Sequence, residues 1–282
     1  MYSMVCIRST RTFFARALII ALVSALLAAA APGCGEKQLK DKVSAPATSP
    51  AAGDRNSFSF IVCGDPQNNY EIFNRVLEAA RQVDFLIIAG DLTGSGTGLE
   101  FQNFVRVMNN NGTRYYAVPG NHDVATSPVT GNYTKYIGRP YGSFSHKNCY
   151  FVLIDNSTPE LGFYPEEREW VAADLKRARA EGYEHYFAVC HVPPGYPYSA
   201  KADRSQIAGI DANHELIPIL AGAGVEELFC GHVHGYYQNK EKGMLVTITG
   251  GAGAPLMGSG SYHHYVRVDI NGKKCEQKVI PL

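Results

Sequence analysis

The stretch Gly120-Asn121-His122-Asp123 follows the apolar run Tyr115-Tyr116-Ala117-Val118 and Pro119. The run predicts a β-strand, and an amide, an imidazole and a carboxylate stand directly after its end. Polar groups in such a position are costly unless they bind something. The stretch therefore predicts a binding site, and other strand ends should supply its remaining groups.

Four other apolar segments also end in side chains that can ligate a metal. In open α/β sheets, ligands bind outside the carboxyl ends of the strands. Two of the segments end in pairs of such residues spaced two apart, so that both members point to the same side of an extended chain. Packing alone gives no reason for this pattern, whereas a metal centre does. The segments are 58–63, 84–89, 184–190 and 225–230, followed by Asp65 and Gln67, by Asp91, by His191, and by His232 and His234.

The order of the predicted elements indicates an α/β fold. Apolar residues at helical spacing predict helices over 70–82 and 99–110 between the first three strands. The clearest helix is Pro165–Glu181, which has proline at its start, acidic residues in its first turns and basic residues near its end. The other predictions are a hairpin of 142–146 and 149–155, a helix over 213–223, strands over 244–249, 262–270 and 274–280, and loops over 124–141 and 250–260.

Together, the motifs resemble those of the calcineurin-like metallophosphoesterases. Their order is Gly-Asp-x-Gln, Gly-Asp, Gly-Asn-His-Asp, His-x-Pro-Pro and Gly-His-x-His, and the resemblance covers about residues 58–240 closely. It implies an α/β fold, namely a four-layer α/β/β/α sandwich with mixed sheets around a two-metal site. By this resemblance, one metal is held by Asp65, Gln67 and His234, the other by Asn121, His191 and His232, and both by a bridging Asp91. His122 would face the leaving group with support from Asp123.

The chemistry that the resemblance implies is hydrolysis of a phosphate ester. Two metals about 3.5–4 Å apart clamp a phosphoryl group and generate an attacking hydroxide near neutral pH. His122, kept protonated by Asp123, would donate a proton to the leaving oxygen. Two divalent ions, two carboxylates and one hydroxide leave a charge of about +1, which favours a phosphate anion. The expected substrate is a small phosphate ester or a nucleotide.

Gln67 departs from the family pattern, in which histidine is usual at this position. The amide leaves the charge of the site unchanged but offers a harder oxygen donor, which favours Mn, Mg or Fe(II) over Zn. Similar Asp-x-Gln variants occur in family branches such as the manganese-dependent ADP-ribose/CDP-alcohol phosphatases. The expected cofactor is two divalent or trivalent metal ions, with Mn or Fe favoured and Zn or Mg as the alternatives.

Two other functions stay open on the sequence. One is a phosphodiesterase, because the motifs do not separate monoesters from diesters. The other is a non-catalytic metal- or phosphate-binding protein of the cell envelope. The His122–Asp123 pair argues against this second alternative, because a protein that only binds has no need of an acid.

The first 33 residues predict an export signal. Three arginines precede the apolar run 17–27, which has about the length of a signal h-region and is short for a membrane span. Residues 31–34, Ala-Pro-Gly-Cys, resemble the end of a bacterial lipoprotein signal, in which the cysteine is acylated. Ordinary cleavage and a retained anchor are the alternatives. Residues 34–56 have linker composition, so the expected product is a domain over 57–282, tethered through Cys34 in the periplasmic cell envelope.

Charge and cysteine content exclude other classes of protein. The chain carries 26 Lys+Arg and 26 Asp+Glu. Without the first 33 residues, which hold three arginines and no acids, the balance is 23 against 26, or −3, and gives no nucleic-acid footprint. The five cysteines of the domain form no disulfide pattern, and nothing indicates an oligomeric state. Predicted as core cysteines are Cys63, Cys190 and Cys230, and as structural or surface histidines His146, His185, His214, His263 and His264.

Overall fold

The computed structural model of the chain describes residues 57–129, 131–158, 163, 165–194 and 215–282. The predicted signal peptide over 1–33, the linker over 34–56 with Cys34, and His214 lie outside these residues. Within the described part of the chain, no helix is both long enough and apolar enough to cross a membrane.

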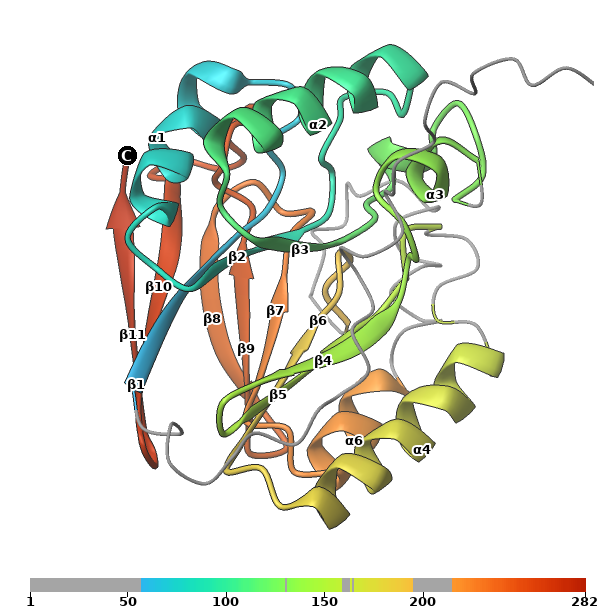
Figure 1. The fold of residues 1–282 in the computed structure, drawn as a ribbon, viewed down its shortest axis with the longest axis vertical. Helices are drawn as coiled ribbons and strands as arrows, with labels where there is room; N and C mark the ends of the chain where they lie inside the picture. Colours follow the sequence, from blue (N-terminus) through green and yellow to red (C-terminus); the bar gives the residue numbers. More distant parts are fainter. Residues whose placement is uncertain (1–56, 130, 159–162, 164, 195–214) are drawn as a thin grey trace, which may run out of the picture. The chain divides into compact units, whose positions relative to one another are not determined.

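Two mixed β-sheets form the middle of the described domain (Figure 1). The first has the strand order β11-β10-β1-β2-β3, in which β1, β2 and β3 are parallel and β10 pairs antiparallel with both β1 and β11. Its strands are β1 (Ser57–Cys63), β2 (Phe85–Ala89), β3 (Tyr115–Val118), β10 (His264–Asn271) and β11 (Lys274–Pro281).

The second sheet has the order β4-β5-β6-β7-β9-β8. Its four central strands are parallel, and antiparallel strands β4 and β8 close the two edges. Its strands are β4 (Gly142–His146), β5 (Cys149–Leu153), β6 (His185–Val189), β7 (Glu227–Cys230), β8 (Tyr236–Glu241) and β9 (Met244–Thr249).

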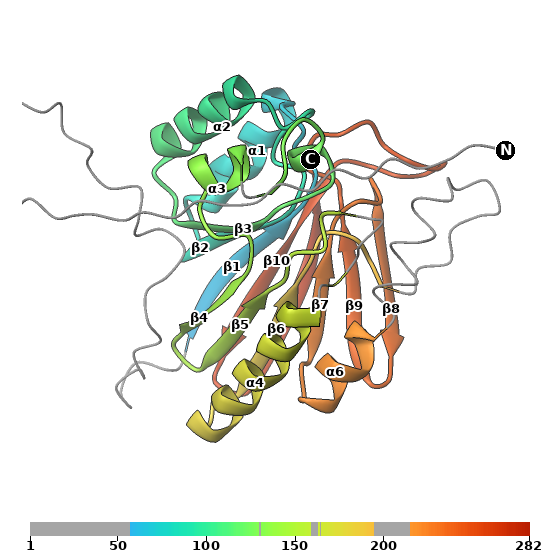
Figure 2. The ribbon, with the colours of Figure 1, turned by 90° about the vertical axis from the view of Figure 1, so that its right-hand side faces the viewer.

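Helices cover the outer face of each sheet, which produces four layers (Figure 2). One apolar cluster lies under the first group of helices, one between the sheets and one under the second group. The α/β/β/α sandwich with mixed sheets that the sequence predicts is thereby confirmed. The first group is α1 (Tyr70–Ala80), α2 (Gly98–Asn111) and α3 (Asn132–Tyr136), and the second is α4 (Pro165–Glu181) and α6 (Leu216–Gly222).

Strand β1 shows how the sequence produces this layering. Phe58, Phe60 and Val62 point into the cluster between the sheets, whereas Ile61 and Cys63 point into the cluster under the helices. A strand covered on both faces has apolar residues on both, which is why the segment 58–63 is apolar apart from the half-buried Ser59.

Two elements differ from the sequence predictions. β8 is not predicted, because it is an edge strand with largely exposed polar residues and no alternating apolar pattern. α3 interrupts the predicted loop over 124–141 with a helix of only five residues. Pro218 is the third residue of α6, a first-turn position where proline causes no kink.

Candidate metal centre

The seven predicted ligands come from the carboxyl ends of five strands and meet at one place. Carboxylate oxygens of Asp65 and Asp91 and a ring nitrogen of His191 lie within 4.8 Å of one another, and all three residues are buried. Both sheets contribute. The first supplies Asp65 and Gln67 after β1, Asp91 after β2 and Asn121 after β3, and the second supplies His191 after β6 and His232 and His234 after β7.

Three of these residues form one group of contacts. His234 Nε2 lies 3.4 Å from Asp65 Oδ1 and 3.4 Å from Gln67 Nε2. The two ends of a side-chain amide differ only by a 180° rotation, so the Gln67 oxygen reaches the same position. The group consists of the residues that the resemblance assigns to one metal.

Three others form a second group around Asn121. Its Oδ1 lies 3.0 Å from His191 Nε2 and 2.8 Å from His232 Nδ1. Asp91 stands between the groups, since Gln67 Nε2 donates to its Oδ2 at 2.8 Å and His191 Nε2 lies 3.4 Å from its Oδ1. This is the place that a bridging carboxylate would occupy.

The backbone is strained where the ligands leave the strands. Asp65, Gln67, Asp91 and His232 all have positive φ, at 62°, 40°, 54° and 68°. A residue other than glycine costs on the order of 1–3 kcal/mol in such a conformation, and this strain clusters at functional sites. Four of the seven predicted ligands therefore adopt a conformation that packing alone does not explain.

Glycines beside the ligands let the strand ends approach one another. A Cβ added to Gly120 would overlap the Asp91 carboxylate and backbone nitrogen. A Cβ on Gly231 would overlap Ala89 O and lie 2.6 Å from Asp65 Oδ2. The glycines at these two positions are required by space rather than by φ.

The contacts of His191 test whether a cation fits the centre. Its Nδ1 lies 2.8 Å from Ala89 O, an acceptor, so this nitrogen carries the ring proton. The lone pair on Nε2 then faces the side-chain amide of Asn121 and a carboxylate oxygen of Asp91, which only accepts when it is ionised. A lone pair directed at a carboxylate is stabilised by a positive charge between them, either a second ring proton or a metal ion.

His234 repeats the arrangement in the other group. Its Nδ1 lies 2.8 Å from Pro255 O, and its Nε2 faces the carboxylate of Asp65. Metal-ligating histidines usually donate their second ring N–H to a carbonyl or carboxylate, which fixes the ring and its tautomer. The donor set therefore fits a pair of metal ions.

The electrostatics of the centre keep one carboxylate ionised and one imidazole neutral. For Asp91, burial acts to raise the pKa, but the charges of His191 and His122 and two hydrogen bonds hold the pKa below its ordinary value. For Asp65, burial and the charge of Asp91 raise the pKa. Burial, aided by the charge of His191, lowers the pKa of His232 to about 3, so this ring is neutral and can act as a ligand.

The structure corrects the expected contact between Asp123 and His122. The buried Asp123 carboxylate accepts hydrogen bonds from the backbone N–H groups of Leu92, Thr93 and Gly120 and from Thr93 Oγ1, at 2.8–3.1 Å. The His122 ring instead places Nδ1 at 2.7 Å from Gly94 O. Asp123 cannot face the ring because the short helical turn His122–Val124 directs the two side chains apart.

Sequence reasoning missed the groups that hold the centre in place. Ala89, Gly94 and Pro255 act through their carbonyl oxygens, which every residue type possesses, so no side-chain pattern could identify them. Thr93 had a weak signal, because it follows Gly90-Asp91 closely. Cys63, Cys190 and Cys230 are fully buried with free thiols, as expected of core residues.

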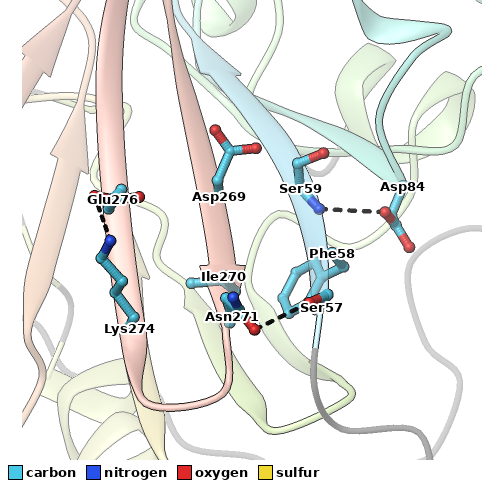
Figure 3. A pocket seen from close by; sticks show the side chains of 9 residues that line it. All are labelled: Ser57, Phe58, Ser59, Asp84, Asp269, Ile270, Asn271, Lys274 and Glu276. Atoms are coloured by element: carbon cyan, nitrogen blue, oxygen red, sulfur yellow. Dashed lines mark hydrogen bonds and ion pairs between the residues drawn. The ribbon is translucent and has the colours of Figure 1, made fainter.

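A hollow of about 470 Å³ lies at the end of the first sheet opposite the candidate metal centre (Figure 3). Its carboxylates already have nitrogen partners. Asp84 accepts from Ser59 N and contacts His146 Nε2 at 3.1 Å. Asp269 binds a neighbouring arginine, and Glu276 lies 2.9 Å from Lys274 Nζ. These acids do not converge on one point, so the hollow is not a metal centre.

Comparisons with known proteins agree with the resemblance that the motifs suggest. The profile of a family described as calcineurin-like phosphoesterase matches residues 58–236. Over 167 residues the chain is 26% identical to a 3′,5′-cyclic-nucleotide phosphodiesterase of Nostoc sp.. This match covers 58% of the chain and 60% of the relative, so the chain spans less than two thirds of that protein.

Solved structures with the same fold include two phosphatases. A dimetal phosphatase from Danio rerio superposes with a TM-score of 0.61 at 14% identity, over 80% of this chain and 96% of that one. A purple acid phosphatase from yellow lupin seeds superposes with a TM-score of 0.65 at 14% identity, over 83% of this chain and 54% of that one.

Proposed function

The chain belongs to the calcineurin-like phosphoesterase family and is a metal-dependent hydrolase, and on that premise we propose that it hydrolyses small phosphate esters or nucleotides. The observation that carries the proposal is the convergence of seven ligand-type side chains in two groups that share Asp91. Two ions bound there would clamp the phosphoryl group and activate water for in-line attack. The Gln67 amide supports Mn or Fe over Zn.

His122 is the proposed proton donor to the leaving oxygen. Gly94 O holds Nδ1–H, so Nε2 is the nitrogen that gives up a proton. Asp91 Oδ2 lies 4.0 Å from this nitrogen. The His122 side chain is 41% exposed, whereas that of Asp91 is buried, so the ring can reach a leaving group that enters from solvent.

Exposed apolar residues in the loop after β9 support a substrate with an organic group. The backbone N–H of Met257 donates to His234 O at 2.9 Å, which places the loop over 250–263 against a ligand residue (orange-red in Figure 2). Leu256, Met257 and Tyr262 of this loop are 36%, 44% and 40% exposed. Exposed apolar surface next to a reactive centre is typical of a ligand-binding wall.

Hydrolysis assays on metal-free protein reloaded with one metal at a time test the proposal. With Mn or Fe(II), the chain should hydrolyse p-nitrophenyl phosphate, bis(p-nitrophenyl) phosphate or a nucleotide. Turnover supported best by Zn alone would contradict the metal preference. If ions bind but no metal supports turnover of any ester, the non-catalytic binding function is correct.

The phosphodiesterase alternative has specific support in the similarity to the phosphodiesterase of Nostoc sp.. The ratio of kcat/KM for a diester to that for the matching monoester decides between the two. A ratio above one favours the diesterase, and a ratio below one favours the monoesterase.

We also propose that the protein is exported and anchored in the bacterial envelope through a lipid on Cys34. The support is the sequence of residues 1–34 alone. Metabolic labelling with a fatty acid should label the wild-type chain in the membrane fraction and leave Cys34→Ala unlabelled. Unlabelled wild-type protein in the periplasm would indicate ordinary cleavage instead.

A further inference from the structure

Asn156 lies just beyond β5, where the second sheet stops being a regular ladder. The last backbone bond between the two neighbouring segments runs from Ile154 N to Val189 O, at 2.9 Å. Past this point the N–H groups of His191 and Val192 have no strand opposite them. Buried N–H groups need a partner, because leaving one unpaired costs about 1–3 kcal/mol.

The side chain of Asn156 takes the place of the missing strand. Its Oδ1 accepts from His191 N at 2.9 Å and from Val192 N at 3.0 Å. Its Nδ2 donates to Val192 O at 2.7 Å. The residue is fully buried, so water does not compete for these bonds.

The loop that carries Asn156 is itself fixed by hydrogen bonds within the loop and to α4. Asp155 Oδ1 accepts from Ser157 N at 3.0 Å and from Ser157 Oγ at 2.7 Å, which closes a tight turn around Asn156. Glu167, in the first turn of α4, accepts from Asp155 N at 2.7 Å. The amide of Asn156 therefore starts from a fixed backbone.

His191 is thus held at three points. Asn156 binds its N–H, Gly231 N donates to its carbonyl at 3.0 Å, and Ala89 O binds its ring Nδ1. We propose that Asn156 is a positioning residue that aims His191 at the second group of the metal centre. The inference rests on the proposed function, because that function defines the centre.

Calorimetric titration of the metal-free full-length chain with Mn²⁺ tests the proposal. The wild type should bind two ions. In Asn156→Ala one of the two affinities should fall about 10- to 100-fold, the usual effect of removing a group that orients a ligand. The other affinity should stay at the wild-type value, because the Asp65–Gln67–His234 group does not contact Asn156.

Asn148→Ala is the matched control. Asn148 is also fully buried, and its Nδ2 donates to Glu184 Oε2 at 2.6 Å and to Gly272 O at 2.9 Å at the opposite end of the same sheet. This variant should lose stability in the metal-free state as Asn156→Ala does, yet bind both ions as the wild type does. If Asn156→Ala fails to fold, Asn156→Ser, which keeps a shorter acceptor, is titrated in its place.

Two further readouts separate positioning from a general structural role. Asn156→Asp keeps an acceptor for both N–H groups. At the site whose affinity falls in Asn156→Ala, Asn156→Asp should bind Mn²⁺ more tightly than Asn156→Ala does. Saturating Mn²⁺ should restore kcat in Asn156→Ala, since every ligand is still present.

Three results would overturn the proposal: unchanged affinities in Asn156→Ala, an equal loss at both sites, or the same loss in Asn148→Ala. A wild-type chain that binds none of Mn²⁺, Fe²⁺, Zn²⁺ and Mg²⁺ would overturn the proposed function as well. Two bound ions without turnover would contradict the proposed function alone.

Discussion

His122 holds its ring between a backbone carbonyl and solvent, near the buried carboxylate of Asp91. Gly94 O binds one ring nitrogen and leaves the other free to face a substrate. Its neighbour Asn121 points the opposite way, into the contacts with His191 and His232. We therefore expect these adjacent residues to separate proton transfer from metal binding.

Replacing His122 should slow turnover without releasing metal. We expect kcat of His122→Ala to fall about 10²- to 10⁴-fold, the usual contribution of a general acid. Metal content measured by mass spectrometry should remain that of the wild type, and Asn121→Ala should lose metal. Equal metal loss in the two variants would contradict this separation.

Asp123 should matter for stability through the loop that it holds. Its four hydrogen bonds come from three backbone N–H groups and one hydroxyl. Asn offers one oxygen and an amide N–H₂ that opposes these donors, so Asp123→Asn should lower the free energy of unfolding by about 2–4 kcal/mol. Urea denaturation of metal-free protein measures this, with Asp84→Asn at an exposed site as control. An unfolding energy equal to that of the control would refute the assignment.

At the scale of single residues, the sequence was informative only where side chains carry the chemistry. Asp, Asn, Gln and His after strands pointed to all seven residues that meet at the centre. The positive φ of Asp65 and Asp91 and the carbonyls of Ala89 and Pro255 have no side-chain signature, so they could not be predicted. Residue order also failed for Asp123, because adjacency does not reveal which way a helical turn directs each side chain.

Among the elements, the loop after β5 and the start of α4 form a tightly coupled pair. Glu167 is buried and binds Asp155 N, and the loop in turn fixes the segment after β6. The helix was predictable from its proline, acidic and basic residues, with the same bounds. The contact was not, because a glutamate in a first helical turn is ordinarily explained by the helix dipole alone.

Glu167→Gln should change how stability depends on pH. Burial, with the charge of Asp155, raises the pKa of Glu167 from 4.5 to about 9. The stability contributed by the neutral carboxyl is fully present below the unfolded pKa of 4.5. It is lost progressively as the pH rises to the folded pKa of about 9. Gln cannot ionise, so the variant should gain stability over the wild type between pH 5 and 9, by up to about 1.4 kcal/mol per pH unit.

Urea denaturation at several pH values between 5 and 9 measures this difference. Glu166→Gln, at an exposed position of the same turn, is the control and should follow the wild-type curve. A constant gap between Glu167→Gln and the wild type at all pH values would show that Glu167 does not titrate in this window.

On the scale of the whole molecule, the two sheets meet through an aromatic core between them and through the candidate metal centre at the carboxyl ends of their strands. Phe60 of β1 meets Phe151 edge to face at 5.3 Å and Phe187 at 5.6 Å across the interface. The layers could be predicted from the order of motifs and the resemblance they support. The pairing of β10 with β1 could not, because a strand's partner so far along the chain has no local sequence signature.

Metal removal should destabilise both sheets together at the carboxyl ends of the strands that carry the ligands. Each ion that binds only the folded chain adds about 2.7 kcal/mol at a hundredfold excess over its Kd. A chelator should therefore lower Tm in a calorimetric scan, and added Mn²⁺ should restore it. The double variant Asp65→Asn/Asp91→Asn is the control, and a chelator that shifts its Tm equally would contradict the metal assignment.

The place of β1 in the first sheet has a consequence for biosynthesis. β1 is among the first strands of the domain to leave the ribosome, yet one of its two neighbours is β10, and the paired residues Ser57 and Asn271 are 214 positions apart. Contacts of such long range form slowly, and an unpaired strand edge can pair with other chains. Folding of the first sheet is therefore completed only after translation of β10 and β11, and chains released before that point expose the unpaired edge of β1.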